Sequence, residues 1–204
     1  MKIDFKTYKL PKENYIEEEA KKNKIVLCNS FNTNMNHYFG WLKRSNGNYK
    51  KTAHFTISSD GIIYQHFDTN YRSNFLKETN LNANSIIIVI ENIGFLEKAP
   101  NNSLITIFGD IYKGDNISEK KWRNFEFWEG YDNKQLLALG KLLIDLCDKH
   151  EIELKIPENN LKLDNIYNYN GILYRANIDK KYTDLNPNWD FKKLKQKIED
   201  GSNK

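Results

Sequence analysis

The sequence predicts an α/β (α+β) fold, with a central mixed β-sheet flanked by helices. Three observations support this prediction. Residues 25–28 and 86–90 are short apolar runs rich in β-branched residues, which is typical of strands buried on both faces. Residues 52–67 alternate as two strands around an Asp-Gly turn. Residues 132–150 carry leucines at helical spacing. Elements of these kinds pack as a sheet covered by helices.

The N-terminal residues 1–23 are polar and predict an extension outside the main domain, with a short helix over 12–22. The first buried strand follows and ends at Asn29 and Ser30. The aromatic-rich stretch 34–44 predicts a short helix or turn whose aromatic side chains face inward.

The segment 52–67 is the clearest hairpin. Ala53, Phe55 and Ile57 alternate with polar residues, and Gly61 supplies the turn position where positive φ is tolerated. By strand alternation His54 faces away from Ala53, which indicates a structural role. His37 and His66 are expected on a loop or strand surface, without an identified partner.

Residues 97–130 predict a long, irregular insertion that includes a short strand pair at most. A loop of this length in one domain is usually functional or covers another part of the molecule. Its aromatic residues either fill a core edge or form a groove wall, and the sequence leaves both readings open: Trp122, Phe125, Phe127 and Trp128.

The helix over 132–150 has a capping box, with Asp132 as N-cap and Gln135 three positions later. After it, residues 171–178 resemble a strand, and 188–200 predict a short charged helix.

The charge balance argues against nucleic acid as a partner, because 31 basic and 27 acidic residues give a net charge of only +4. The N-terminus has no apolar signal region, and no apolar run reaches the roughly 18 residues of a membrane helix. We therefore expect a soluble protein without membrane contact, either cytoplasmic or phage-released. Cys28 and Cys147 do not form a disulfide framework, although a bond between them is left open.

The order of several segments resembles the zinc-dependent type 2 N-acetylmuramoyl-L-alanine amidases, a family that includes the peptidoglycan recognition proteins. These segments are "IVLCNS", "AHFTISSDGIIYQ", "NANSIIIVIEN", "GYDNKQLLALGKLLIDLC" and "YTDLNPNWDF". The resemblance implies an amidase-like domain over 24–198, with the insertion 97–130 inside it and a tail at 199–204. It also implies a bacterial or phage cell-wall setting. The family cleaves the amide between the lactyl group of N-acetylmuramic acid and L-alanine, using a zinc ion held by two histidines and an Asp or Cys.

Matching the family's zinc ligands to this chain retains only one of the three. Cys28 stands in the place of the first histidine, and a thiolate there could bind zinc. Tyr174, or Leu173 with a one-residue slip, replaces the second histidine, and a phenol is a poor ligand. Asp184 matches the third ligand. We therefore expect no family-type zinc, with Cys28 and Asp184 as weak metal candidates.

The family's assisting groups are also altered. Val89 stands in the place of the catalytic glutamate, while Glu91 matches a later acidic position on the same strand face. Lys181 and Tyr182 flank the Asp184 loop. Glu91, Lys181 and Tyr182 are thus the catalytic candidates. A Cys28–His54 nucleophile pair is a further alternative, but it lacks an orienting third group.

The resemblance predicts a protein that recognises a peptidoglycan fragment or muropeptide without cleaving it. The ligand-binding candidates are Cys28, Asn29, Trp128, Tyr174, Arg175 and Asp184. Two alternatives remain open. One is an active amidase with an altered metal site, and the other is an interaction or inhibitor protein that kept the fold for a protein partner.

Overall fold

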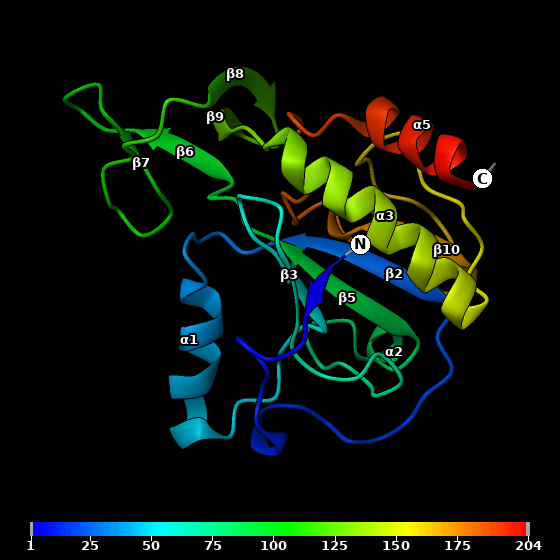
Figure 1. Cartoon of the computed structure of the whole chain (residues 1–204). Coiled ribbons are helices and arrows are strands. Elements are labelled where there is room, and N and C mark those ends of the chain that lie inside the picture. Colours follow the sequence, from blue (N-terminus) through cyan, green and yellow to red (C-terminus); the bar gives the residue numbers. More distant parts are fainter. Residues whose placement is uncertain (1, 203–204) are drawn as a thin grey trace.

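A computed structural model describes residues 2–202 and shows a mixed central sheet with helices on its faces (Figure 1). The strand order in this sheet is β1-β4-β3-β5-β2-β10. Only the β3–β4 pair is antiparallel, so the predicted mixed sheet is confirmed. The strands are β1 Ile3–Asp4, β2 Lys24–Asn29, β3 Phe55–Ile57, β4 Ile63–Gln65, β5 Ser85–Ile90 and β10 Gly171–Tyr174.

The helices connect and cover these strands. They are α1 Asn36–Lys43, α2 Thr79–Asn82, α3 Asn133–His150, α4 Arg175–Ile178 and α5 Phe191–Ser202. Short 3-10 turns lie at η1 Lys12–Asn14, η2 Arg44–Gly47 and η3 Ile166–Asn168. The predicted helices at 34–44, 132–150 and 188–200 are therefore present, while the strand-like segment 171–178 is half strand and half helix.

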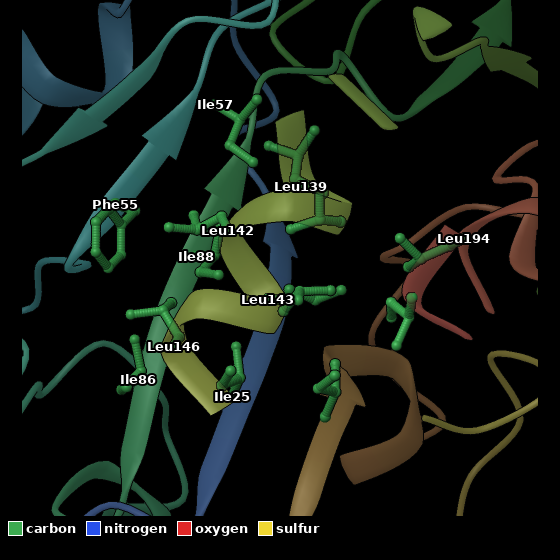
Figure 2. Close-up of a cluster of buried hydrophobic side chains, with 14 of the residues drawn as sticks. Ile25, Phe55, Ile57, Ile86, Ile88, Leu139, Leu142, Leu143, Leu146 and Leu194 are labelled. Atoms are coloured by element: carbon green, nitrogen blue, oxygen red, sulfur yellow. The ribbon is translucent and has the colours of Figure 1, made fainter. Parts of the chain in front are cut away.

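Alternating residues of β2 and β5 divide the core between the two faces of the sheet. Ile25 and Ile86 pack under α3 and α5, together with Leu139, Leu143 and Leu194 (Figure 2). Val26 and Cys28 point to the opposite face, where the α1 side chains cover them. All six residues of each strand are buried, because helices cover both faces of these parallel strands.

The insertion is more regular than the sequence predicts. It forms a second, antiparallel sheet of order β7-β6-β9-β8 (upper left and top of Figure 1). Its strands are β6 Phe95–Lys98, β7 Leu104–Ile105, β8 Ile117–Trp122 and β9 Phe125–Glu129. The prediction of an irregular loop was wrong because β8 is mostly exposed and carries no apolar run to mark it as a strand.

The N-terminal segment belongs to the fold. Its strand β1 pairs in parallel with β4 at the edge of the central sheet, and Leu10 and Tyr15 are buried in the core on the α1 face. The predicted helix over 12–22 is reduced to the turn η1. At the other end α5 runs through the expected boundary at 198, and residues 203–204 of the predicted tail lie outside the described residues.

Helix α3 begins with the predicted capping box. The Asp132 carboxylate accepts a hydrogen bond from the Lys134 backbone N–H at 2.7 Å, and the Asp132 N–H donates to Gln135 Oε1 at 3.0 Å. The Gln135 amide also donates to the Glu91 carbonyl at 2.7 Å, so the cap fixes the helix to the end of β5.

Cys28 and Cys147 are both free and buried, and they lie on opposite faces of the sheet. Within residues 2–202, none of the helices combines the length and apolar character required to span a membrane.

Candidate functional site

A cavity of about 370 Å³ lies where β2 and β10 end, against α1 and next to the insertion. Its polar floor includes Asn29, the last residue of β2, and Arg175, which follows β10. These strands are parallel, so their carboxyl ends meet at one edge of the sheet. Ligand sites of α/β sheets commonly lie at this edge. Arg44 and Lys51 also line the cavity, and none of its lining residues, all within the described chain, is an Asp or Glu.

Arg175 and Asp184 form a buried ion pair beneath the cavity. Arg175 Nε lies 2.9 Å from Asp184 Oδ1 and 2.8 Å from Oδ2. The Asp184 side chain is 0% exposed, whereas the Arg175 side chain is 15% exposed and reaches the cavity. The carboxylate is thus the inner partner, and the guanidinium stands between it and the cavity.

Asp184 also accepts a hydrogen bond from the Asn29 backbone N–H at 2.9 Å, so both of its oxygens have partners. Burial raises the pKa of the Asp184 carboxyl, and the Arg175 guanidinium and the Asn29 N–H act against that rise. Burial alone would lower the pKa of Arg175, but the adjacent Asp184 carboxylate outweighs it, so the pKa is raised. Arg175 therefore carries a permanent positive charge at this position.

The Asp184 loop is held by a network of buried amides and a phenol. Tyr131 donates to Asn29 Oδ1 at 2.7 Å and accepts from the Asn186 backbone N–H at 3.1 Å. The Asn186 side-chain amide donates to Asn92 Oδ1 at 3.1 Å. These bonds fix the loop against the ends of β2 and β5, which makes the ion-pair geometry rigid.

Aromatic rings surround the guanidinium. Arg175 Cζ lies 4.7 Å from the ring centre of Tyr182, 5.8 Å from that of Phe75 and 5.9 Å from that of Phe31. The Tyr182 hydroxyl donates to the Glu78 carboxylate at 3.1 Å. Burial, with Glu78 nearby, raises the pKa of Tyr182 to about 12, so this phenol remains protonated at neutral pH.

The two metal candidates from the sequence, Cys28 and Asp184, do not form a site that fits zinc. Zinc sites need at least three protein ligands, and among residues 2–202 no cluster of three or more His, Cys, Asp or Glu side chains could hold a metal ion. The Asp184 oxygens are occupied by Arg175 and Asn29. Burial raises the pKa of the Cys28 thiol, which keeps it protonated and a poor ligand.

The carboxylate of the candidate acid Glu91 is hydrogen-bonded to backbone N–H groups. It accepts from the Met35 N–H at 2.6 Å and from the Ser59 N–H at 3.2 Å. Burial raises the pKa of Glu91, and these two hydrogen bonds oppose the rise. Glu91 is only 4% exposed and does not line the cavity, so its geometry indicates that it joins two loops to the end of β5.

Three further candidates lie away from the cavity. Tyr174 is buried on the α3 and α5 face, with its ring 4.9 Å from that of Phe191, because strand alternation turns it from the side that Arg175 faces. Trp128 is buried in the second sheet and donates its ring N–H to the Lys120 carbonyl at 2.7 Å. Lys181 is exposed and does not line the cavity. The positively charged side chain that pairs with Asp184 is that of Arg175 and not that of Lys181.

The histidines are structural in a way that the sequence does not reveal. His54 Nε2 donates to the Tyr71 carbonyl at 2.9 Å and Nδ1 accepts from the Ile87 N–H at 3.0 Å, so no ring nitrogen is free to activate Cys28. The expectation of surface positions for His37 and His66 was wrong. Both are buried and hydrogen-bond the Thr56 hydroxyl, at 2.9 and 2.8 Å.

Sequence reasoning missed the hydrogen-bonding roles of His37 and Tyr131 at the site. His37 lies on α1 and lines the cavity, and Tyr131 lies just before α3. Both reach the site from elements whose sequence pattern marks a core face, and no local motif signals their polar contacts.

Solved structures with a similar fold include two amidases and a third protein, AmpDh3. The chain matches the N-acetylmuramoyl-L-alanine amidase LysC from Clostridium intestinale URNW at TM-score 0.56 and 17% identity, over 98% of each chain. It matches AmiD from E. coli, in complex with anhydro-N-acetylmuramic acid-L-Ala-D-gamma-Glu-L-Lys, at TM-score 0.55 and 17% identity, over 92% of this chain and 65% of AmiD. It matches AmpDh3 from Pseudomonas aeruginosa, in complex with an anhydromuramic pentapeptide, at TM-score 0.53 and 14% identity, over 97% of this chain and 66% of AmpDh3.

No curated protein sequence is significantly similar to the chain. The model of the family described as N-acetylmuramoyl-L-alanine amidase, however, matches residues 15–167, which include the central strands β2, β3, β4 and β5 and the helix α3. The observed fold agrees with that match from β2 to α3. The chain therefore belongs to the N-acetylmuramoyl-L-alanine amidase family, whose activity is directed at peptidoglycan.

Proposed function

We propose that this protein binds a peptidoglycan fragment or muropeptide in the Arg175 cavity, holds no family-type zinc ion there and does not hydrolyse the ligand. The observation that carries the proposal is the Arg175–Asp184 ion pair. Asp184, the residue that the resemblance matches to a family zinc ligand, is neutralised by a guanidinium at 2.8 Å. A divalent cation beside Asp184 would meet the positive charge of Arg175 and a protonated Cys28.

The ligand class rests on two supports. The first is family membership over residues 15–167. The second is the complexes of AmiD and AmpDh3, which share this fold and contain anhydromuramic peptides. The cavity volume of about 370 Å³ suits one sugar or a short peptide segment, so a larger fragment would extend beyond it.

The test combines metal content, binding and product formation on one preparation. Protein purified without chelator and dialysed against zinc should retain far less than one equivalent of zinc by mass spectrometry. A muramyl tripeptide should bind by calorimetry and remain intact by chromatography. Lys181→Gln is the matched control, because Lys181 is exposed and does not line the cavity.

Three outcomes would contradict the proposal. Stoichiometric zinc with release of free peptide would identify an active amidase with an altered metal site. Hydrolysis that persists without zinc would show catalysis by other groups. An absence of binding to any cell-wall fragment would favour an interaction protein that reuses the fold.

A further inference from the structure

The cavity contains polar atoms that the rest of the protein leaves without partners. Asn29 is 2% exposed, and its side-chain Nδ2 is a buried donor with no hydrogen-bond partner. Its Oδ1 is already used by Tyr131, so the free atom is the N–H donor. Arg175 uses only Nε on Asp184, and neither terminal nitrogen has a hydrogen-bond partner within the described residues. Asn29 and Arg175 therefore offer unpaired donors to one cavity.

His37 supplies a hydrogen-bond acceptor, and a chain of hydrogen bonds determines this role. The Tyr8 carbonyl can only accept, so His66 Nδ1, at 2.7 Å from it, carries the proton. Burial lowers the pKa of His66 to about 4, so the ring is neutral and Nε2 accepts from the Thr56 hydroxyl. The single hydroxyl proton of Thr56 is thereby used, and His37 Nε2–H must donate to its oxygen.

Neutral His37 then has a lone pair on Nδ1. Burial lowers the pKa of His37 to about 3, so this state holds at neutral pH. The Nδ1 atom is buried and has no partner, and His37 lines the cavity. A buried polar atom without a partner carries a free-energy cost that a ligand can relieve. The lining residues thus present unpaired donors on Asn29 and Arg175 and an unpaired acceptor on His37.

The positive charge of the cavity determines which kind of acceptor group on a ligand binds most strongly. Arg44 and Lys51 are exposed lining residues, and no Asp or Glu lines the cavity within residues 2–202. A guanidinium with two free terminal nitrogens forms its strongest hydrogen bonds with a planar carboxylate. A neutral amide oxygen would gain no comparable charge-assisted bond.

We infer that the Arg175 cavity binds the free carboxylate of its ligand, with the carboxylate on Arg175 and Asn29 and a neighbouring ligand hydroxyl or amide N–H on His37. This inference rests on the proposed function for the identity of the ligand. A muramyl fragment offers two sources of that chemistry, the lactyl carboxylate of N-acetylmuramic acid and the carboxylates of the stem peptide. In a muramyl peptide, the lactyl carboxylate becomes free only when the amide to L-alanine is hydrolysed. With that source, the site would recognise the product of an amidase reaction.

The test is calorimetric titration of the full chain with five probes. N-acetylmuramic acid carries the lactyl carboxylate, its lactyl amide is the neutral equivalent, and N-acetylglucosamine lacks the lactyl group. L-Ala-D-gamma-Glu-L-Lys tests the peptide carboxylates, and glucuronic acid is a carboxylate sugar from outside the cell wall. The acid should bind at least about tenfold more tightly than its amide, and its affinity should fall as salt rises.

The double variant Arg175→Met/Asp184→Asn removes both charges, so that no buried carboxylate is left unpaired. It should abolish the preference for acid over amide. His37→Phe should weaken both probes to a similar extent and leave their ratio unchanged, because the His37 acceptor contacts a different ligand group. Lys181→Gln should bind as the native protein does.

The outcomes separate this inference from the proposed function. Binding of the tripeptide alone, lost in the double variant, would support the inference with the peptide as the source. Equal binding of acid and amide, unchanged in the double variant, would overturn the inference and leave the proposed function standing. Binding of glucuronic acid through Arg175, with no cell-wall probe bound, would overturn the proposed function and retain a carboxylate site. An absence of binding to every probe would overturn both.

Discussion

At the scale of single residues, the Arg175–Asp184 pair shows how a buried partner determines the charge of a site. The carboxylate is completely buried and its oxygens are filled by Arg175 and the Asn29 N–H. Removing the arginine alone would leave a buried charge without compensation, which typically costs about 3–5 kcal/mol.

We therefore predict that Arg175→Met lowers the free energy of unfolding by about 3–5 kcal/mol at pH 7. The loss should shrink on acidification. Without Arg175 the pKa of Asp184 is raised above its unfolded value, so the folded state binds a proton that the unfolded state does not, and stability is regained as pH falls. Urea denaturation at pH 7 and pH 4.5 measures this. The double variant Arg175→Met/Asp184→Asn should recover most of the loss, and a double variant as unstable as Arg175→Met would refute the explanation.

Gly61 is a second position where one residue decides local structure. Its φ is +83°, and an added Cβ would lie 2.8 Å from the Lys134 carbonyl oxygen. Gly61→Ala should therefore cost both backbone strain and a steric clash, about 2–4 kcal/mol together. Gly109→Ala is the matched control, since Gly109 has φ +85° with no atom within 4 Å of the added Cβ. Equal losses of unfolding free energy in the two variants would show that contact with α3 contributes nothing.

At the scale of elements, the capping box at the start of α3 is hydrogen-bonded to Glu91 at the end of β5. Asp132→Ala removes the cap and should cost about 1 kcal/mol of unfolding free energy. Gln135→Ala should cost more, about 1–3 kcal/mol, because it also leaves the buried Glu91 carbonyl without its partner. Asp145→Ala, an exposed change within the same helix, should be within about 0.5 kcal/mol of neutral. A Gln135→Ala loss no larger than that of Asp132→Ala would mean that the bond to Glu91 is replaced by water.

The elements also show how much of the fold could be predicted from the sequence. Strands β2 and β5, the β3–β4 hairpin and α3 were predictable because apolar period, turn chemistry and capping all agree within short segments. The second sheet was not predictable, since β8 is exposed and its pairing with β9 includes an irregularity. Polar strands that pair non-locally show no local periodicity of apolar residues by which the sequence could reveal them.

The site was predictable only where residues follow strands in order along the chain. Asn29 and Asp184 come from segments that the sequence marks as a strand end and a loop. Arg175 lies within the segment 171–178 that resembles a strand, and the structure brings the three residues together. Tyr174 was misplaced by one step of strand alternation, and its neighbour Arg175 faces the cavity instead. His37 contributes through bonds to Thr56 and, beyond it, His66, and a network of this kind has no sequence signature.

At the scale of the whole molecule, the insertion extends the amidase-like core toward the cavity. Ile107 and Phe108, in the segment that follows β7, line the cavity and are 49% and 63% exposed. The core thus supplies a rigid polar floor, while the insertion supplies an apolar wall that water still reaches. If the proposed ligand binds here, we expect its polar group to lie on this floor and its remainder at the surface.

The buried histidines make the whole molecule sensitive to acid. Burial lowers the pKa of His37 and His54 to about 3 and that of His66 to about 4. In the unfolded chain each has a pKa of about 6.5. Between these values the unfolded state binds protons that the folded state does not, so stability falls as pH drops from about 6.5 toward 4.

His54 gives this prediction a structural cause that can be tested alone. Its Nδ1 accepts from the Ile87 N–H of β5 at 3.0 Å, and a proton on that nitrogen would place two donors against each other. In His54→Asn an amide oxygen can accept the same bond without titrating. The slope of unfolding free energy against pH between 4.5 and 6 should then decrease by about 1.4 kcal/mol per pH unit. This is the slope that one proton bound by the unfolded state alone contributes. Urea unfolding at several pH values measures both slopes, and an unchanged slope would mean that His54 is protonated in the folded state over this range, as it is in the unfolded state.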